Sequence, residues 1–285
     1  MAKPILVIHG GAGSGPCAGE SYDKYVKSMS TIAEKAFAVL KKGGSALDAV
    51  VAASVLLEDD PIYNAGKGSK IQSDGKIRMS ASLMDGAEQR FSGCINVEGV
   101  KNPIHLARAL LNHEDRVLGG RGARQYAKQL GLPFASPFTK KCREDYKARL
   151  KGKTGTIGAL ALDKKGRLAA ATSTGGRGFE YPHRVSDSPT VAGNFATAKA
   201  AVSATGKGEA IVDHSAAASI CALVDAGWTL EKSVKHVLGK AKKHGATFGL
   251  IALDGKGRFV ATTTTKTLIW AAATADGVEV FKATH

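Results

Sequence analysis

Thr156 is the residue of this chain best placed to act as a nucleophile. It follows Gly155 and begins an alternating apolar run, and a highly basic segment that contains prolines lies just upstream. That arrangement is expected if the chain cuts itself between these two residues. A threonine at a new N-terminus carries a hydroxyl nucleophile and, on the same residue, an amine that can act as its base. Such an amine has a pKa of about 8 and accepts a proton near neutral pH. The alternative is that threonine simply favours a strand here.

An internal repeat supplies Thr156 with a partner hydroxyl. Residues 156–174 and 247–265 align without gaps at an offset of 91, and 11 of the 19 positions are identical. Each copy has the pattern of a strand, a turn and a strand, and Lys-Gly before arginine favours a three-residue hairpin loop. If the aspartate and arginine that flank the first loop close it, Thr156 lies opposite Thr174, with Cβ atoms about 5 Å apart. We therefore predict two similar hairpins in one sheet, the first of which pairs two threonine hydroxyls.

Two further groups of residues could bind and polarise a substrate. Arg184 and Asp187 are three positions apart, where a guanidinium could hold a carboxylate and an aspartate an ammonium group. These are the two charged ends of an α-amino acid. Glycines in the segment 205–209 lead into a helix, whose first backbone N–H groups would stabilise a developing oxyanion. The alternatives are a surface ion pair in a loop and an ordinary helix start.

Motifs that suggest a nucleotide are weaker. Residues 13–18 follow a strand and loosely imitate a dinucleotide fingerprint, but Pro16 interrupts the turn and Glu34 falls within a helical pattern. Residues 152–154 imitate the end of a P-loop, but lysine occupies the position of its first glycine. A nicotinamide-dependent enzyme is therefore kept only as an alternative of another class.

The net charge of +15 raises the hypothesis of a basic nucleic-acid-binding protein. Residues 139–153 hold seven Lys and Arg against two acids, about a third of the excess. The remaining basic residues scatter without aromatic residues that could stack bases. We expect a solvated basic surface and no nucleic-acid partner. Four widely spaced cysteines suggest free thiols, and no apolar run approaches the roughly 20 residues that span a bilayer. A cytoplasmic protein with no membrane partner is expected.

Hydrophobic periodicity and turn residues divide the chain into strands, helices and one linker. An apolar stretch from Ile5 predicts a buried strand, followed by a glycine-rich turn over 9–19. Segment 132–155 carries two prolines, seven Lys and Arg, and little apolar periodicity, which predicts a linker. Strands that flank helical pairs indicate a layered α/β architecture. Helices are predicted over 25–42, 46–57, 104–112, 123–130, 209–226 and 230–243, with Ser45, Asn102 and Thr229 as N-caps, and further strands over 77–84 and 90–97.

With these residues assembled, the chain resembles the plant-type asparaginase and isoaspartyl aminopeptidase family of N-terminal nucleophile hydrolases. Seven motifs occur in the order typical of that family, nearly from end to end. They are HGGAG at 9–13, NAGKGS at 64–69, ASLMDG at 81–86, GTIGA at 155–159, ATSTGG at 171–176, RVSDSP at 184–189 and ATGKGE at 204–209. Each motif alone is modest, but seven in this order are a highly specific signal.

The resemblance implies a single domain over 1–285 with a four-layer αββα sandwich. It implies a precursor that cuts itself into an α subunit, 1–155, and a β subunit, 156–285, with 132–155 as a flexible basic linker before the cut. Two such pairs would form a heterotetramer. No cofactor is expected for catalysis.

Roles for individual residues also follow from motif position. Thr156 would be the nucleophile, with Thr174 supporting it. The other implied roles are α-carboxylate binding by Arg184, α-amine binding by Asp187, an oxyanion hole at Thr205 and Gly206, a pocket wall at Gly208, support from Asn64, Gly10 and Gly11, and a sodium ion held by backbone carbonyls of the loop before Asn64. No other metal site is expected.

The reaction implied by the resemblance is hydrolysis of the β-amide of L-asparagine or of isoaspartyl dipeptides, with release of L-aspartate. Another β-aspartyl amide, such as glycosylated asparagine or a taspase-like protein substrate, is the alternative. The chain departs from the family's pattern at His183 and Ser186, where glycine is usual, and at Ser80, where aspartate is common. If either glycine requires a positive φ, the backbone that positions Arg184 and Asp187 would shift.

Overall fold

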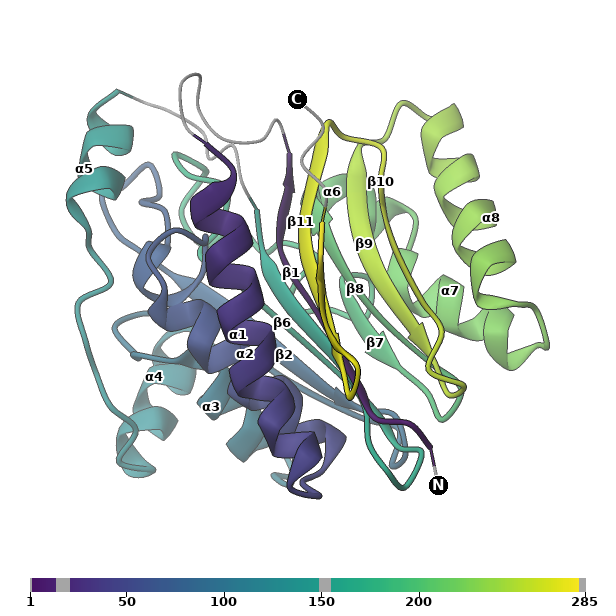
Figure 1. Cartoon of the computed structure of the whole chain (residues 1–285). Coiled ribbons are helices and arrows are strands. Elements are labelled where there is room, and N and C mark those ends of the chain that lie inside the picture. The colour runs from purple at the N-terminus through teal and green to yellow at the C-terminus, as the bar shows by residue number, and fades with distance from the viewer. Residues whose placement is uncertain (1, 14–20, 149–154, 282–285) are drawn as a thin grey trace.

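Two sheets packed face to face form the centre of the molecule (Figure 1). The computed structural model describes residues 2–13, 21–148 and 155–281, and within them the larger sheet has eight strands and the smaller four. The larger contains β12 (Gly277–Val280), β11 (Thr267–Thr274), β1 (Ile5–Gly13), β5 (Ile157–Leu162), β6 (Leu168–Thr174), β2 (Met79–Asp85), β3 (Arg90–Val97) and β4 (Val117–Gly119), in this spatial order. The smaller contains β10 (Phe259–Thr263), β9 (Phe248–Asp254), β8 (Ala200–Gly206) and β7 (Asn194–Ala196), again in spatial order.

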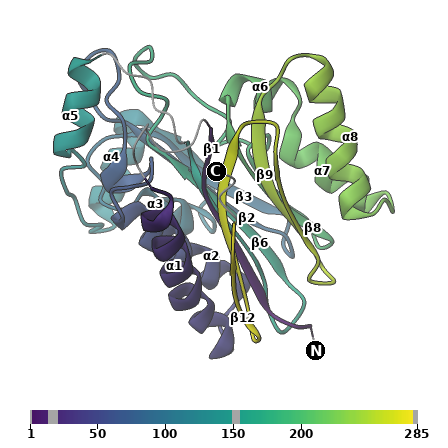
Figure 2. The same ribbon diagram turned by 45° about the horizontal axis from the view of Figure 1, so that its top comes forward.

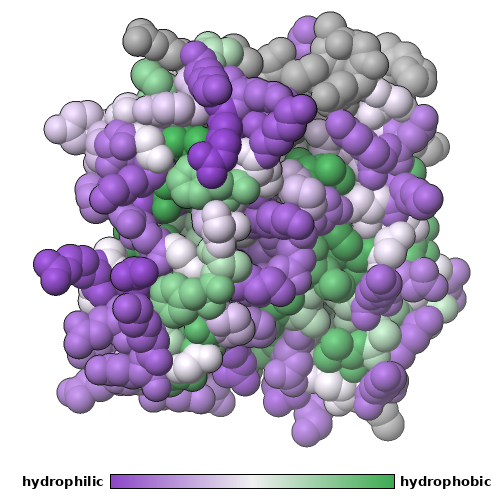
Figure 3. All heavy atoms as spheres, turned by 90° about the vertical axis from the view of Figure 1, so that its left-hand side faces the viewer, coloured by the Kyte–Doolittle hydropathy of each residue, from purple (hydrophilic) through white to green (hydrophobic). Residues whose placement is uncertain are grey.

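Helices cover the outer face of each sheet. The larger sheet is covered by α1 (Asp23–Lys41), α2 (Ala46–Asp59), α3 (Pro103–Leu110) and α4 (Gly120–Gln129), and the smaller by α6 (Gly208–Asp213), α7 (Ala216–Asp225) and α8 (Leu230–Lys243). Figure 2 shows the two helical layers on opposite sides of the paired sheets. The face that carries α4 and α5 (Lys140–Lys147) is mostly hydrophilic, with smaller hydrophobic patches (Figure 3).

Three apolar layers hold the four structural layers together. In β1, Leu6 and Ile8 point to the cluster under α1 and α2, whereas Ile5 and Val7 pack between the sheets. Successive strand side chains point to opposite faces, so a strand buried on both faces needs this uninterrupted apolar run. A third cluster lies between the smaller sheet and α6 to α8. The predicted αββα sandwich is therefore confirmed.

The two repeated hairpins lie in different sheets, which corrects the prediction that they share one. The first consists of β5 and β6 in the larger sheet, and the second of β9 and β10 in the smaller. An aspartate and an arginine close each hairpin loop. The sheet that each hairpin joins depends on its neighbouring strands, which are β1 and β2 for the first and β8 for the second.

Several predicted boundaries also need correction. β1 continues through Gly13, so the expected turn over 9–19 begins later, and residues 14–20 lie outside the described part of the chain. Helix α5, capped by Thr139, occupies part of the predicted linker 132–155. The helix predicted over 209–226 is two helices, because Ser215 between them has a left-handed backbone with φ of 44°.

Capping hydrogen bonds form at two of the three predicted helix caps. Ser45 accepts a hydrogen bond from the Asp48 N–H at 3.1 Å, and Thr229 accepts one from Lys232 at 3.3 Å. Asn102 does occupy the N-cap position of α3, before Pro103, but its side-chain amide donates to Asp59 Oδ1 at 3.1 Å and makes no capping bond. In the described residues no helix is long and apolar enough to cross a bilayer.

Candidate active site

The register of the first hairpin brings Thr156 to Thr174, as the sequence predicted. Ile157 pairs with Ser173 and Leu162 with Leu168, so the next pair outward is these two threonines. The Thr156 hydroxyl donates to the Thr174 hydroxyl at 3.2 Å, and their residues are only 6% and 4% exposed. A buried hydroxyl held by a second hydroxyl has a restricted rotamer, which is what an attacking group requires.

A second hydroxyl, from Ser188, lies on the other side of Thr156 Oγ1. The two oxygens are 3.3 Å apart, and Ser188 is fully buried. Its carbonyl accepts a hydrogen bond from Ser82 Oγ at 2.6 Å, which fixes the loop that carries it. Ser186 Oγ is within 3.5 Å of Ser188 Oγ. Ser188 belongs to the RVSDSP motif, but no role was predicted for it from the sequence.

Glycines allow β1 and β8 to approach the Gly155–Thr156 junction. Gly11 has a φ of 117°, and a Cβ added there would lie 2.6 Å from the Gly155 nitrogen. Gly10 could not carry a side chain either, because its Cβ would lie 2.5 Å from the Tyr63 ring. Both positions therefore exclude a side chain, which lets the neighbouring backbone approach closely.

Thr205 and Gly206 flank the same junction. The Thr205 hydroxyl accepts from the Ala12 N–H at 3.2 Å and donates to the Thr156 carbonyl at 3.3 Å. A Cβ on Gly155 would lie 2.9 Å from Thr205 Oγ1 and 3.7 Å from the Gly206 nitrogen. Hydroxyl and N–H donors beside an amide group are the geometry that stabilises negative charge on its oxygen during acyl transfer.

Arg184 and Asp187 converge on Gly208, and the ion-pair partner of Arg184 is Glu209. A Cβ on Gly208 would lie 2.8 Å from both Arg184 Nη2 and Asp187 Oδ1. Arg184 Nε donates to Glu209 Oε1 at 2.8 Å, so the alternative of a simple surface pair between Arg184 and Asp187 is wrong. The hydrogen bond from Arg184 lowers the pKa of Glu209 to about 2. Glu209, which holds the guanidinium in place, was missed by the sequence analysis.

Asp187 is prepared to receive a positive charge. It is 2% exposed, and Oδ2 has no hydrogen-bond partner among the described residues. Burial raises the pKa of this carboxyl to about 7, and the charge of Arg184 opposes the rise only in part. Because an unpaired buried carboxylate is costly, an ammonium group that reaches it is bound favourably.

His9 is buried under the nucleophile strand but cannot serve as its base. Its Nε2 lies 2.9 Å from Ser203 Oγ, and burial lowers the pKa of the imidazole to about 3. A base with so low a pKa takes up protons poorly at neutral pH.

Asn64 holds the loop that follows β6. Its side-chain amide donates to the Gly176 carbonyl, and its own carbonyl accepts from the Gly175 N–H at 3.0 Å. The Gly176 N–H in turn donates to Thr174 Oγ1 at 3.2 Å. Asn64 is therefore connected to the nucleophile through two intermediate residues, in keeping with the supporting position predicted for it.

The departures from the family pattern have different consequences. His183 adopts a φ of 65°, so the left-handed conformation is kept without glycine. Asn96 stabilises it by donating to the His183 carbonyl at 2.8 Å, and Gln72 accepts from its N–H at 3.2 Å. Ser186 has no positive φ. Hydrogen bonds with two distant segments thus support the left-handed backbone at His183, next to Arg184.

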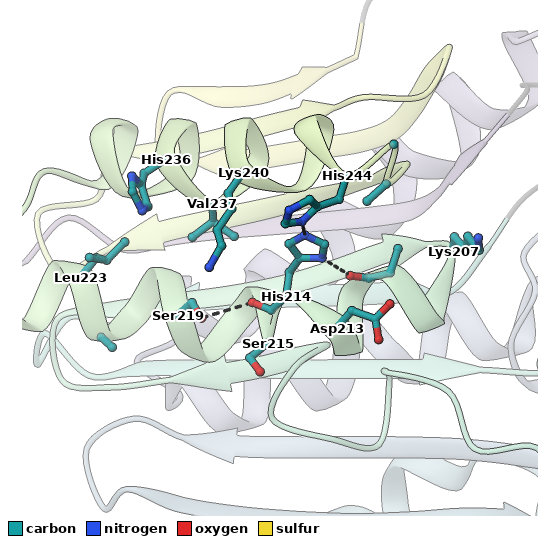
Figure 4. Close-up of a pocket in the computed structure, with 14 residues that line it drawn as sticks. Lys207, Asp213, His214, Ser215, Ser219, Leu223, His236, Val237, Lys240 and His244 are labelled. Carbon is teal, nitrogen blue, oxygen red and sulfur yellow. Dashed lines mark hydrogen bonds between the residues drawn. The ribbon is translucent and has the colours of Figure 1, made fainter.

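The predicted nucleophile Thr156 and the predicted substrate-binding residues Arg184 and Asp187 line one cavity of about 330 Å³. Its walls include Gly155, Thr156, Thr174, Arg177, Arg184, Ser186, Asp187, Gly206, Lys207, Gly208, Thr247 and Thr265. A larger cavity, about 870 Å³, lies between α7 and α8 and does not contain Thr156 (Figure 4). Residues 14–18 and 152–154, which carry most of the two competing nucleotide motifs, lie outside the described part of the chain.

Comparisons with known proteins agree with the geometry. A family model described as Asparaginase matches residues 2–282. The isoaspartyl peptidase/L-asparaginase of Nostoc sp. is 43% identical over 278 residues, which cover 90% of this chain and 87% of that protein. The human isoaspartyl peptidase/L-asparaginase is 39% identical, covering 95% and 93%. The plant-type L-asparaginase of Pyrobaculum calidifontis is 36% identical, covering 92% and 94%. The chain therefore belongs to the asparaginase family, a family of enzymes that hydrolyse amide bonds, as its seven motifs predicted.

Proposed function

We propose that this protein is a self-processed threonine amidohydrolase that cleaves the β-amide of L-asparagine or of isoaspartyl dipeptides and releases L-aspartate. One observation supports this most directly. The buried Thr156 hydroxyl shares a small cavity with Gly206 and with a carboxylate and a guanidinium that fit the two ends of an amino acid. A cavity of about 330 Å³ favours such small substrates over a glycosylated asparagine or a protein.

Self-cleavage comes first in this mechanism. Thr156 Oγ1 attacks the Gly155 carbonyl carbon, while Thr205 and the Gly206 N–H stabilise the negative charge that develops on the oxygen. The peptide C–N bond breaks, the hydroxyl proton moves to the departing nitrogen, and an ester joins Gly155 to Thr156 Oγ1. Water then hydrolyses the ester. The products are an α chain ending at Gly155 and a β chain beginning with a free Thr156 amine.

Substrate cleavage repeats the same acyl transfer. Arg184 binds the α-carboxylate and Asp187 the α-ammonium of the aspartyl residue. The Thr156 amine takes the proton from Oγ1, which attacks the β-carbonyl carbon, and the proton passes to the leaving nitrogen. Ammonia or an amino acid departs, leaving a β-aspartyl ester. Water hydrolyses this ester, releases L-aspartate and restores the hydroxyl.

The test is the state and activity of the purified protein. We expect two fragments of 155 and 130 residues, the smaller beginning at Thr156, and aspartate release from L-asparagine or β-aspartyl dipeptides. Mass spectrometry, N-terminal sequencing and an aspartate assay measure these. Full activity in a chain that is intact by mass spectrometry would overturn the mechanism.

We further propose that a sodium ion fixes the loop before Asn64. A Cβ on Gly68 would meet the carbonyl oxygens of Tyr63 and Pro61, the latter at 2.7 Å, and a Cβ on Gly66 would meet the Glu58 carbonyl. Carbonyl oxygens that converge on side-chain-free positions suit a hard cation. The ion would orient Asn64 and take no part in the reaction. A higher melting temperature in sodium chloride than in choline chloride of equal ionic strength would support this site, and equal values would contradict it.

We also propose an assembly and a location for the protein. We expect two αβ pairs to associate into a heterotetramer of twice the 29.5 kDa chain mass, located in the cytoplasm. Light scattering after gel filtration measures the mass. A single αβ pair over the working concentration range would contradict the heterotetramer.

A further inference from the structure

Two cationic side chains of the catalytic cavity take no part in the proposed binding of an amino acid. Arg184 is paired with Glu209 and faces the α-carboxylate, and Asp187 faces the α-ammonium. Arg177 and Lys207 also line the cavity and are exposed to solvent. Neither side chain makes a hydrogen bond or ion pair to the described residues. Glu209, the nearby carboxylate whose pKa Arg177 helps to lower, is already hydrogen-bonded to Arg184, and L-asparagine, which has no net charge, brings no further anion for the two cations.

The backbones of Arg177 and Lys207 are anchored beside the reacting groups. The Arg177 N–H donates to the carboxylate of Glu180, a residue only 2% exposed, and the Lys207 N–H donates to the Thr247 carbonyl at 3.2 Å. Arg177 follows Thr174 by three positions, and Lys207 stands between the oxyanion glycine and the pocket glycine. Both side chains therefore extend from backbone that is fixed at the wall of the cavity containing Thr156.

Isoaspartyl dipeptides carry the charge that would match these cations. Their leaving residue has a carboxylate whose carbon is two bonds from the scissile amide nitrogen, only about 2.5 Å away. A dipeptide that presents its β-carbonyl to Thr156 must place this second carboxylate in or beside the same cavity. The aspartyl part uses one anion and one cation, so the second carboxylate gives the substrate a net charge of −1.

We infer that Arg177 and Lys207 form a subsite for the α-carboxylate of the leaving residue, so that dipeptides with a free C-terminal carboxylate are preferred over L-asparagine and over C-terminally blocked peptides. This inference rests on the proposed function. It goes beyond it by assigning the leaving-group specificity to two named side chains.

Arg177 is the cleaner residue to test. Lys207 also lines the larger cavity, where Figure 4 shows it at the end remote from His236. A change at Lys207 would therefore affect two places. Arg177 is exposed, so its substitution should leave folding intact, and self-cleavage and melting temperature check this.

The experiment compares kcat/KM for β-aspartylglycine and β-aspartylglycinamide, which differ only in the terminal charge. We expect the unblocked dipeptide to be preferred about tenfold, and the preference to shrink in 0.5 M salt because exposed charges are screened. In Arg177→Gln the ratio should fall to about two- to threefold, mainly through a higher KM for the unblocked dipeptide. Arg177→Lys should keep most of the preference for the unblocked dipeptide, and Lys207→Gln should lower that preference.

A charge-matched control is Lys256→Gln, in an exposed hairpin loop, which should leave the ratio unchanged. Equal turnover of the two dipeptides by cleaved wild-type protein would overturn the subsite and leave the proposed function intact. An unchanged ratio in both Arg177→Gln and Lys207→Gln would do the same. No turnover of either dipeptide or of L-asparagine by cleaved protein would overturn the proposed function and the subsite together.

Discussion

The hairpins 156–174 and 247–265 have nearly the same loop but lie in different sheets. Asp163 and Asp254 each accept hydrogen bonds from the backbone N–H groups two and four residues later, and each pairs with the arginine four residues on, at 2.7 and 2.6 Å. The strand registers correspond position by position. The local sequence alone is sufficient to form this loop, because it supplies both the carboxylate and its donors.

The strand ends of the two hairpins behave differently. The first hairpin lies inside the larger sheet between β1 and β2, so Thr156 is buried and bonded to Thr174. The second lies at an edge of the smaller sheet, where Thr247 is exposed and Thr265 bonds to Thr263 at 2.8 Å. The same residue type at the same repeat position therefore becomes a candidate nucleophile only where neighbouring strands bury and orient it.

The largest expected effect separates Thr156 from Thr247. Thr156→Ala should abolish self-cleavage and lower kcat by on the order of 10⁴-fold or more, since no other group supplies the attacking oxygen. Thr247→Ala should still be cut between Gly155 and Thr156. Gel electrophoresis and aspartate release check both variants. Near-normal turnover by Thr156→Ala would break the comparison.

A smaller difference is expected between Thr174 and Thr265. Thr174→Ala removes the hydroxyl that bonds Thr156, and kcat should fall by about 100-fold. Thr265→Ala should lower it by less than about tenfold, because the Thr265 hydroxyl bonds Thr263 and the Thr267 carbonyl. Measurements need protein that has been cut completely. Equal losses in the two variants would show that burial of Thr156 matters more than its partner.

The buried carboxylate of Asp187 should make substrate turnover depend on pH near neutrality. Burial raises the pKa of Asp187 to about 7, and binding of an ammonium group needs the ionised form. We therefore expect protonation of Asp187 to contribute a fall of about tenfold in kcat/KM per pH unit below 7, in addition to the fall caused by protonation of the Thr156 amine. A pH profile from 5 to 9 measures this, and the Thr156 amine, with a pKa of about 8, adds a second step. Asp187→Asn should lose the lower step; its persistence would assign it to another group.

The smallest effect concerns the two loop aspartates. Burial opposes ionisation of Asp163, but its bonds to Arg167 and backbone N–H groups lower its pKa overall. Its contribution to stability is thus present above the unfolded pKa of about 4 and is lost as pH falls through the folded value. Asp163→Asn should lower the free energy of unfolding at pH 7 by about 2–3 kcal/mol, and Asp254→Asn by about 1 kcal/mol less.

The reason for this difference is one extra contact. Asp163 Oδ2 also accepts the Ala46 N–H at the start of α2, at 3.2 Å. Urea unfolding in the uncut Thr156→Ala background measures the two variants on a single chain. Equal losses of unfolding free energy would mean that the hydrogen bond from α2 contributes no stability beyond that of the loop's own contacts.

The sequence predicted those parts of the site that depend on local pattern. The alternation of β1, the loops at Asp163 and Asp254 and the caps at Ser45 and Thr229 all follow from side chains that bond within a few residues. It did not predict α5, because a helix with one buried residue leaves little apolar periodicity. It also missed the break at Ser215, since Ser-Ala-Ala is compatible with a continuous helix.

The sequence did not predict contacts between residues that are distant along the chain. The bond of Arg184 to Glu209 joins residues 25 apart, and the contact of Ser188 with Thr156 joins residues 32 apart. The conformation of His183 likewise depends on Asn96 and Gln72, which belong to other parts of the chain. No local propensity encodes such pairs.

By itself the sequence determined the hairpin that presents Thr156, its register with Thr174 and, through seven ordered motifs, the family. Only the tertiary structure decided which of two similar hairpins is buried beside Gly11, Thr205 and Ser188. Hydrogen-bonded loops depend on neighbours in the chain, whereas burial depends on which strands pack on either side. For that reason the same threonine can be a strand residue in one sheet and a candidate nucleophile in the other.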